Sequence, residues 1–215
     1  MRKSERIDKI YQSGVIAVIR RPAPEKIIPI AEALVSGGVH TLEITADSER
    51  VYDMIRDVKA RFGDEALVGA GTVLDEVTAK QAIEAGSDFI FAPNFDRATV
   101  EMGNRYGAVT IPGVMTPTEI VQAYSAGADL VKVFPATAMG PSYIKDLKGP
   151  LGHIPMIPTG GVNLDNVETY VKNGAFAVGA GGSLLDKKLI QAEDFKGLEN
   201  LAREFKEKVE TARKG

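Results

Sequence analysis

The chain has 215 residues, of which 44% are hydrophobic and 26% are charged, and its formal net charge at pH 7 is −3. This balance is ordinary for a globular protein and provides no basic field, so we expect neither nucleic acid nor a membrane as a partner. The chain has no cysteine and only two histidines, His40 and His153, so we predict no disulfide, no metal and no other cofactor. No apolar run reaches roughly 18 residues and no apolar signal segment is present, which predicts a cytoplasmic protein.

Two kinds of segment alternate along the chain. No linker divides residues 1–215 into more than one domain. Eight short β-rich apolar runs end in Gly, Pro or Thr, and longer stretches with helical spacing follow them. The apolar runs cover 14–20, 40–45, 66–72, 88–93, 108–113, 129–135, 154–160 and 175–181, and the helical stretches include 24–38, 78–88, 116–129 and 194–213. Repeated units of this kind predict an α/β fold, a (β/α)8 TIM barrel. The amphipathic stretch 2–12 predicts an extra N-terminal helix closing the barrel bottom.

An open, doubly wound sheet is the alternative architecture. Such a sheet usually has fewer strands and a glycine-rich nucleotide fingerprint after its first strand. Here the first apolar run is followed by "RRPAPEK", which contains no glycine. The sequence therefore favours the barrel, in which functional residues lie at the C-terminal ends of the strands and in the loops after them.

A lysine stands in the middle of the apolar run "DLVKVFPA" at 129–136. Alternation along a strand places Val131 and Val133 against the helices, and this arrangement points Lys132 into the barrel. Burial lowers the pKa of a lysine, and a neutral amine can attack a carbonyl group to form a Schiff base. Lys132 is therefore the candidate nucleophile.

A glutamate from the second strand is predicted to face the same interior. Glu43 points inward when Leu42 and Ile44 face the helices. A carboxylate within reach of a Schiff base can carry the protons that making or breaking a C–C bond requires. The alternative is a buried structural ion pair between Glu43 and Lys132, although desolvation makes such pairs poor stabilisers.

Two further polar residues lie at strand ends. Arg20 ends the first strand, and Thr72 ends the third. We expect Thr72 to share an inward face with Val68 and Ala70, since these residues alternate along the strand. Together with Lys132 and Glu43, the two residues form a predicted constellation of four polar side chains from four strands.

Two glycine-rich stretches, "PTGGVNLDN" at 158–166 and "GAGGSLL" at 179–185, follow the seventh and eighth predicted strands. In barrels, the loops after these two strands often bind phosphate through free backbone N–H groups. The predicted phosphate-binding residues are Gly160, Gly161, Gly182 and Ser183. The alternative is a pair of tight turns that need glycine only for their backbone conformation.

These motifs together resemble the class I aldolases for 2-keto-3-deoxy-6-phosphogluconate (KDPG), which often also act on 4-hydroxy-2-oxoglutarate (KHG). The resemblance extends from "VIAVIR" to "GAGGSLL" and rests on "GGVHTLEIT", "VGAGTVL", "IPGVMTPTE", "VKVFPA" and "IPTGGVNLDN". It implies a homotrimer that cleaves KDPG to pyruvate and glyceraldehyde 3-phosphate without a metal. Cleavage of KHG to pyruvate and glyoxylate is a further implied activity.

The resemblance also implies a role for each residue that matches a family motif. Lys132 would form the Schiff base, and Glu43 would be the general acid and base. The implied substrate contacts are Arg20 and Thr72 at the pyruvate carboxylate, Thr159 near the hydroxylated part, Pro93 and Phe134 at the pocket wall, and Gly160, Gly161 and Ser183 at the phosphate. Some family members have an arginine where this chain has Asp47, so carboxylate binding would depend on Arg20 here.

Two other functions stay open at this point. A phosphosugar isomerase or synthase would use Glu43 and Lys132 as acid and base without an imine. A barrel used as an assembly scaffold would form an oligomer with no turnover. Covalent trapping of a keto acid on Lys132 distinguishes an aldolase from both.

Overall fold

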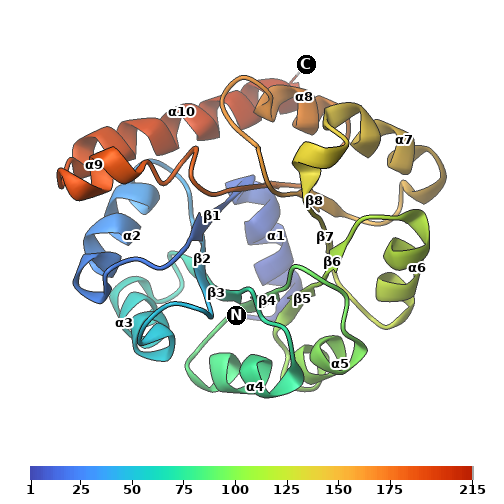
Figure 1. The fold of residues 1–215 in the computed structure, drawn as a ribbon, viewed down its shortest axis with the longest axis horizontal. Helices are drawn as coiled ribbons and strands as arrows, with labels where there is room; N and C mark the ends of the chain where they lie inside the picture. The colour runs from blue at the N-terminus through green and yellow to red at the C-terminus, as the bar shows by residue number, and fades with distance from the viewer. Residues whose placement is uncertain (215) are drawn as a thin grey trace.

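The computed structural model describes residues 1–214 and has short strands at its centre, surrounded by helices (Figure 1). The strands are β1 (Val15–Ile19), β2 (Thr41–Thr45), β3 (Leu67–Gly71), β4 (Phe89–Phe91), β5 (Val109–Ile111), β6 (Gly113–Val114), β7 (Val131–Val133), β8 (Met156–Pro158) and β9 (Val178–Ala180). Their pairings are parallel. Each of the predicted apolar runs contains a strand, so this part of the prediction is confirmed.

The strands form two sheets. One has the order β5-β4-β3-β2-β1-β9, and the other has the order β6-β7-β8. Pro112 separates β5 from β6, because its nitrogen has no hydrogen to donate to a strand ladder. The fifth predicted strand therefore pairs with β4 through one half and with β7 through the other. The fold is α/β, with a curled parallel sheet of six strands and a second sheet of three.

Helices follow the strands and form the outer layer (Figure 1). They are α2 (Ile27–Ser36) after a 3₁₀ turn η1 (Pro24–Lys26), α3 (Val51–Phe62), α4 (Glu76–Glu84), α5 (Arg97–Arg105), α6 (Pro117–Ser125), η2 (Ala136–Ala138), α7 (Pro141–Leu151), α8 (Val167–Lys172), α9 (Lys187–Gln191) and α10 (Phe195–Lys214). Asp75, Asp96 and Thr116 accept hydrogen bonds from the first turns of α4, α5 and α6, which explains where these helices begin. Within residues 1–214, none of the helices combines the length and the apolarity needed to cross a bilayer.

The strand side chains alternate between two hydrophobic clusters. An outer cluster between the strands and the helices contains Val131 and Val133, as the alternation predicts. The inner cluster, enclosed by the strands, contains Ile10, Ile16, Leu67, Phe89, Phe91, Val109, Ile111, Leu130, Ile157 and Ala177. Val68 and Ala70 belong to the outer cluster, so the prediction that they share the inward face with Thr72 is wrong.

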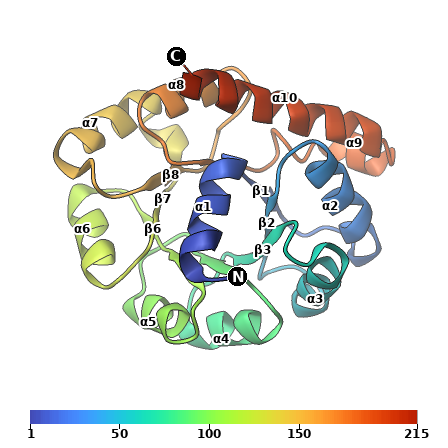
Figure 2. The same ribbon diagram turned by 180° about the vertical axis from the view of Figure 1, so that it is seen from behind.

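The helix predicted over 2–12 is α1 (Lys3–Ser13), which crosses the N-terminal ends of the strands and lies in front of them in Figure 2. Ile10 on this helix is buried in the inner cluster. Lys3 Nζ lies 2.8 Å from Asp129 Oδ2, and Arg6 Nε lies 3.2 Å from Asp88 Oδ1. These contacts fix α1 beneath the strands, so the opposite, C-terminal end is the one left open for a site.

Candidate active site

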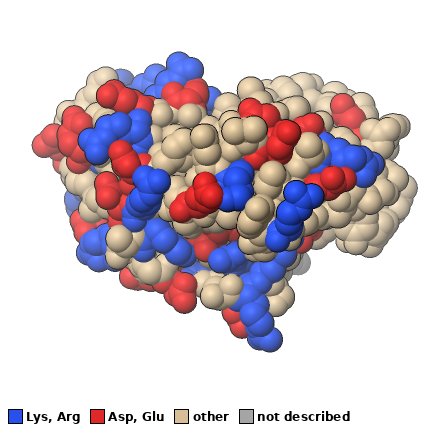
Figure 3. Space-filling model, turned by 90° about the horizontal axis from the view of Figure 1, so that it is seen from below, with Lys and Arg blue, Asp and Glu red and all other residues tan. Residues whose placement is uncertain are grey.

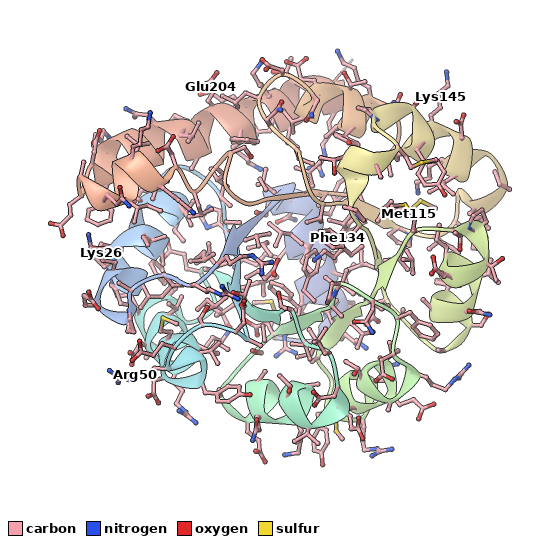
Figure 4. The ribbon with its side chains drawn as sticks, viewed as in Figure 1. Lys26, Arg50, Met115, Phe134, Lys145 and Glu204 are labelled. Atoms are coloured by element: carbon pink, nitrogen blue, oxygen red, sulfur yellow. The ribbon has the colours of Figure 1, made fainter. Side chains whose placement is uncertain are left out.

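A cavity of about 260 Å³ opens at the C-terminal ends of β1, β7, β8 and β9. Its lining residues are Val18, Arg20, Lys132, Phe134, Thr159, Gly160, Gly161, Val162, Asn163, Gly181, Gly182 and Ser183. Figure 4 shows the labelled Phe134 near the centre of the ring of helices, whereas Lys26, Arg50 and Lys145 lie at its edge. The structure therefore brings together most of the residues that the sequence predicts for the site.

Lys132 is the central residue of β7 and is only 3% exposed. Its Nζ atom lies 4.3 Å from the centroid of the Phe91 ring and 4.6 Å from that of Phe134. Burial lowers the pKa of Lys132 and outweighs the attraction of Glu43, which acts in the opposite direction. A lysine in this environment supplies the neutral amine that attack on a carbonyl group requires.

Glu43 on β2 is fully buried, and neither of its carboxylate oxygens has a hydrogen-bond partner among the described residues. Burial raises the pKa of Glu43 to about 7, against the opposing charges of Lys132 and Arg20. The neighbouring strand makes room for this side chain through Gly71, where a Cβ atom would lie 1.6 Å from Glu43 Oε1. The result is a carboxyl group that can gain or lose a proton near neutral pH.

Arg20 and Thr72 meet at the rim of the cavity. Arg20 Nη2 lies 3.5 Å from Thr72 Oγ1, and Arg20 Nη1 lies 3.7 Å from Asp47 Oδ2. Asp47 makes a shorter ion pair with Arg21, at 2.7 Å. Thr72 reaches the rim because its backbone leaves the strand in the left-handed region, with φ of 56°, and not because it alternates with Val68. Arg20 is therefore the cation at the rim that faces the cavity.

The two glycine-rich loops form another wall of the cavity. Gly160 and Gly161 follow β8 with φ of 96° and 75°, a region that favours glycine. The backbone N–H groups of Gly160, Gly161, Gly182 and Ser183 donate no hydrogen bond within residues 1–214. The Ser183 hydroxyl donates to the Val162 carbonyl at 2.5 Å. Free amides around a concave surface are suited to bind an anion.

Some predicted residues lie outside the cavity lining. Pro93 packs against β6, where a Cβ atom on Gly113 would lie 2.2 Å from the Pro93 oxygen. Thr159, in contrast, lines the cavity and is 5% exposed. Glu43 and Thr72 also lie outside the lining. Sequence reasoning missed Phe91, although alternation with the helix-facing Ile90 could have placed it beside Lys132.

A buried amine, a buried carboxyl group and free backbone amides share the C-terminal end of a parallel α/β fold. Within residues 1–214, no group of three or more His, Cys, Asp or Glu side chains is arranged to hold a metal ion. The amine can form an imine with a keto acid, the carboxyl group can transfer protons, and the amides can bind an anionic tail. This fold and site define a class I aldolase, an enzyme that cleaves C–C bonds through a lysine imine.

Comparison with known proteins gives the family. The model of the family described as "KDPG and KHG aldolase" matches residues 7–201. A 2-dehydro-3-deoxy-phosphogluconate aldolase of Haemophilus influenzae is 33% identical over 199 residues, which is 92% of this chain and 93% of that protein. A KHG/KDPG aldolase of Escherichia coli K12 is 32% identical over 199 residues, with the same coverage. The chain belongs to the KDPG and KHG aldolase family.

One similar solved structure contains a covalent intermediate of the reaction with pyruvate. The KDPG aldolase of Legionella pneumophila, with pyruvate captured at low pH as a covalent carbinolamine intermediate, superposes with a TM-score of 0.85. The two sequences are 28% identical, and the alignment covers 92% of this chain and 96% of that one. A carbinolamine is the adduct that precedes an imine, so the captured species of that enzyme lies on a class I pathway.

Proposed function

We propose that this enzyme cleaves KDPG to pyruvate and glyceraldehyde 3-phosphate, and that it also cleaves KHG to pyruvate and glyoxylate. The observation that carries the proposal is the position of Lys132, which is buried between two aromatic rings and opens onto a cavity walled by free backbone amides. KDPG has a keto acid at one end and a phosphate at the other. These two charged ends match Arg20 and the glycine loops, which line the same cavity.

The proposed reaction begins when the neutral amine of Lys132 attacks the C2 ketone, and loss of water gives the iminium ion. Glu43 takes the proton from the C4 hydroxyl group, through a water molecule. The C3–C4 bond then breaks, the aldehyde leaves, and the electron pair of the bond moves into the enamine. The enamine takes a proton at C3, and hydrolysis releases pyruvate and restores the amine.

The proposed binding roles follow from the positions around the cavity. Arg20 and Thr72, which meet at 3.5 Å, bind the C1 carboxylate at the rim. Thr159 contacts the hydroxylated carbons, and Phe134 forms part of the wall. Pro93, which lies outside the lining, has a supporting role through its contact with β6. The phosphate is bound by the amides of Gly160, Gly161, Gly182 and Ser183.

We also infer that the two sheets close into one (β/α)8 barrel within a single domain. The Phe176 N–H donates to the Met156 carbonyl at 2.9 Å, and Thr159 forms a bridge with Gly179, so β8 lies beside β9. On the other side, Pro112 divides one strand between the two sheets. These links support a continuous ring of strands, with α1 covering the N-terminal ends of the strands.

A homotrimer is the proposed assembly. Support comes from apolar side chains left exposed on α6 and directly after η2, namely Val121, Tyr124 and Met139. Figure 3 shows charges of both signs over much of one face and a right-hand region with few of them. Light scattering should give a mass near three times the chain mass of 23.0 kDa. The cytoplasmic location stays a prediction.

Borohydride reduction in the presence of pyruvate, followed by peptide mass mapping, tests the proposed chemistry. We expect a reduced pyruvyl adduct on the peptide that contains Lys132. Lys132→Gln should abolish the adduct and the cleavage of KDPG, whereas Lys145→Gln, at an exposed position on α7, should leave both unchanged. A folded protein that gives no adduct at Lys132, or a Lys132→Gln variant that retains turnover, would overturn the proposal.

A further inference from the structure

A second and larger cavity lies at the other end of the molecule, among the C-terminal ends of α1 and α10, the end of α8 and the side of α7. Its volume is about 670 Å³. The lining residues are Tyr11, Lys148, Val171, Lys172, Gly174, Ala175, Phe176, Ala212 and Arg213. Three of them are cationic and none is acidic. Neither the proposed reaction nor the α1 contacts described above use these residues.

Two of the three cations have only neutral partners. Lys148 Nζ donates to the carbonyl oxygens of Gly152 and Ile154, at 3.2 and 2.9 Å. Arg213 donates to the carbonyl oxygens of Tyr11 and Phe176, at 2.6 and 2.8 Å. Within residues 1–214 neither side chain forms an ion pair. Their hydrogen bonds fix their positions but leave their positive charges uncompensated.

The third cation is only partly neutralised. Lys172 Nζ lies 3.6 Å from Glu168 Oε2, and the other oxygen of this carboxylate, Oε1, lies 3.3 Å from Lys208 Nζ. Glu210, the other acid near Arg213, pairs with Lys206 at 3.2 Å. The acidic side chains close to the cavity are therefore already shared with other lysines, and the cavity has a net positive charge.

The remaining walls are aromatic and aliphatic. The rings of Tyr11 and Phe176 lie 5.1 Å apart at a 50° tilt, and the Arg213 guanidinium lies 4.1 Å from the centroid of the Tyr11 ring. Val171, Ala175 and Ala212 supply the aliphatic surface. A volume of this size falls within the range of small-molecule sites, in which apolar walls surround a few polar groups.

We propose that this cavity binds an organic phosphate that carries a planar ring, a ligand of nucleotide size. The phosphate would lie among Lys148, Lys172 and Arg213, since charge-assisted hydrogen bonds to phosphate are strong. The ring would lie on Phe176 and Tyr11. Because the cavity is at the N-terminal ends of the strands, its ligand does not compete with the keto acid.

Titration of the ¹⁵N-labelled full chain with AMP, followed by NMR, tests the proposal. We expect the amide signals of residues 171–176 and 11–14 to shift and saturate together. Lys148→Gln and Lys172→Gln should each weaken the AMP affinity at these signals about tenfold or more. Adenosine, which lacks the phosphate, should bind to the wild-type protein at least as weakly as AMP binds to either variant. Signals from Gly160, Gly161 and Gly182 report separately on AMP in the active site and should not depend on the two variants.

Two design features keep the outcome clear. The Lys172 side chain makes no hydrogen bond to the backbone within residues 1–214, so Lys172→Gln should fold even where Lys148→Gln does not. Lys145→Gln removes one charge from the outer side of α7, which Figure 4 shows at the edge of the molecule, and should leave the AMP affinity unchanged. Unmoved signals at 171–176, equal affinity for adenosine, or equal weakening by Lys145→Gln would overturn the proposal.

Discussion

The change Glu43→Gln removes a buried titrating group and keeps its size. Burial raises the pKa of Glu43 from the ordinary 4.5 to about 7. The folded protein therefore holds a proton that the unfolded chain releases between these values, so wild-type stability falls as the pH rises through this window. The shift corresponds to about 3 kcal/mol of unfolding free energy, most of it between pH 5 and pH 8. Glu43→Gln should lose this dependence together with KDPG cleavage.

The assay is urea unfolding followed by circular dichroism at pH 5 and pH 8, at one protein concentration. Each variant is compared with itself at the two pH values, so the constant cost of burying the new amide cancels. Loss of the Glu43 charge also lowers the pKa of Lys132 further. A lysine with a lowered pKa makes stability rise with pH, so this effect also opposes the fall in stability that the wild type shows. Glu204→Gln, at the exposed position labelled in Figure 4, is the matched control and should behave as wild type. Parallel pH dependence in Glu43→Gln and wild type would refute the reasoning.

Three further predictions concern single side chains. Gly71→Ala should lower kcat at least tenfold, because its Cβ atom would lie 1.6 Å from Glu43 Oε1; Gly149→Ala, which meets open space, should leave kcat unchanged, and equal kinetics in both variants would contradict this account. Arg20→Gln should raise KM for KDPG about tenfold or more with a smaller change in kcat, because a charged hydrogen bond to the carboxylate is lost, and an unchanged KM would show that another group binds it. Asp88→Asn should destabilise the protein by about 3 kcal/mol, measured by urea unfolding, since it leaves two cations without their buried partner, and a shifted KM would argue against a purely structural role.

The sequence predicts the two most buried polar residues of the site well. Glu43 and Lys132 each stand between apolar neighbours that must face the helices, so alternation determines their direction. The glycine loops are also predictable, because their place after the last two strand regions determines the end of the fold at which they lie. These features depend on short-range patterns, which a single sequence contains.

Other features depend on geometry that such patterns do not contain. Thr72 reaches the rim through a left-handed backbone at the strand end, whereas alternation assigned it to the face of Val68 and Ala70. The ion pair of Arg21 with Asp47 joins loops that follow different strands, and their approach is set by the paths of both loops. Pro112 signals the break in the fifth strand region, but not that the two halves join different sheets.

The position of α1 has a consequence for the order in which the chain is assembled. This helix leaves the ribosome before the residues that it contacts, because Lys3 and Arg6 hydrogen-bond to Asn104 and Gly107, which lie 101 residues further along the chain. Synthesis proceeds from the N-terminus, so the surface that receives α1 is not complete until Gly107 has been made. Val109, Ile111 and Leu130, which belong to the inner cluster with Ile10, are made later still. Docking of α1 therefore follows the synthesis of β1 to β4 and of α2 to α5, and its amphipathic face stays exposed on the growing chain until then.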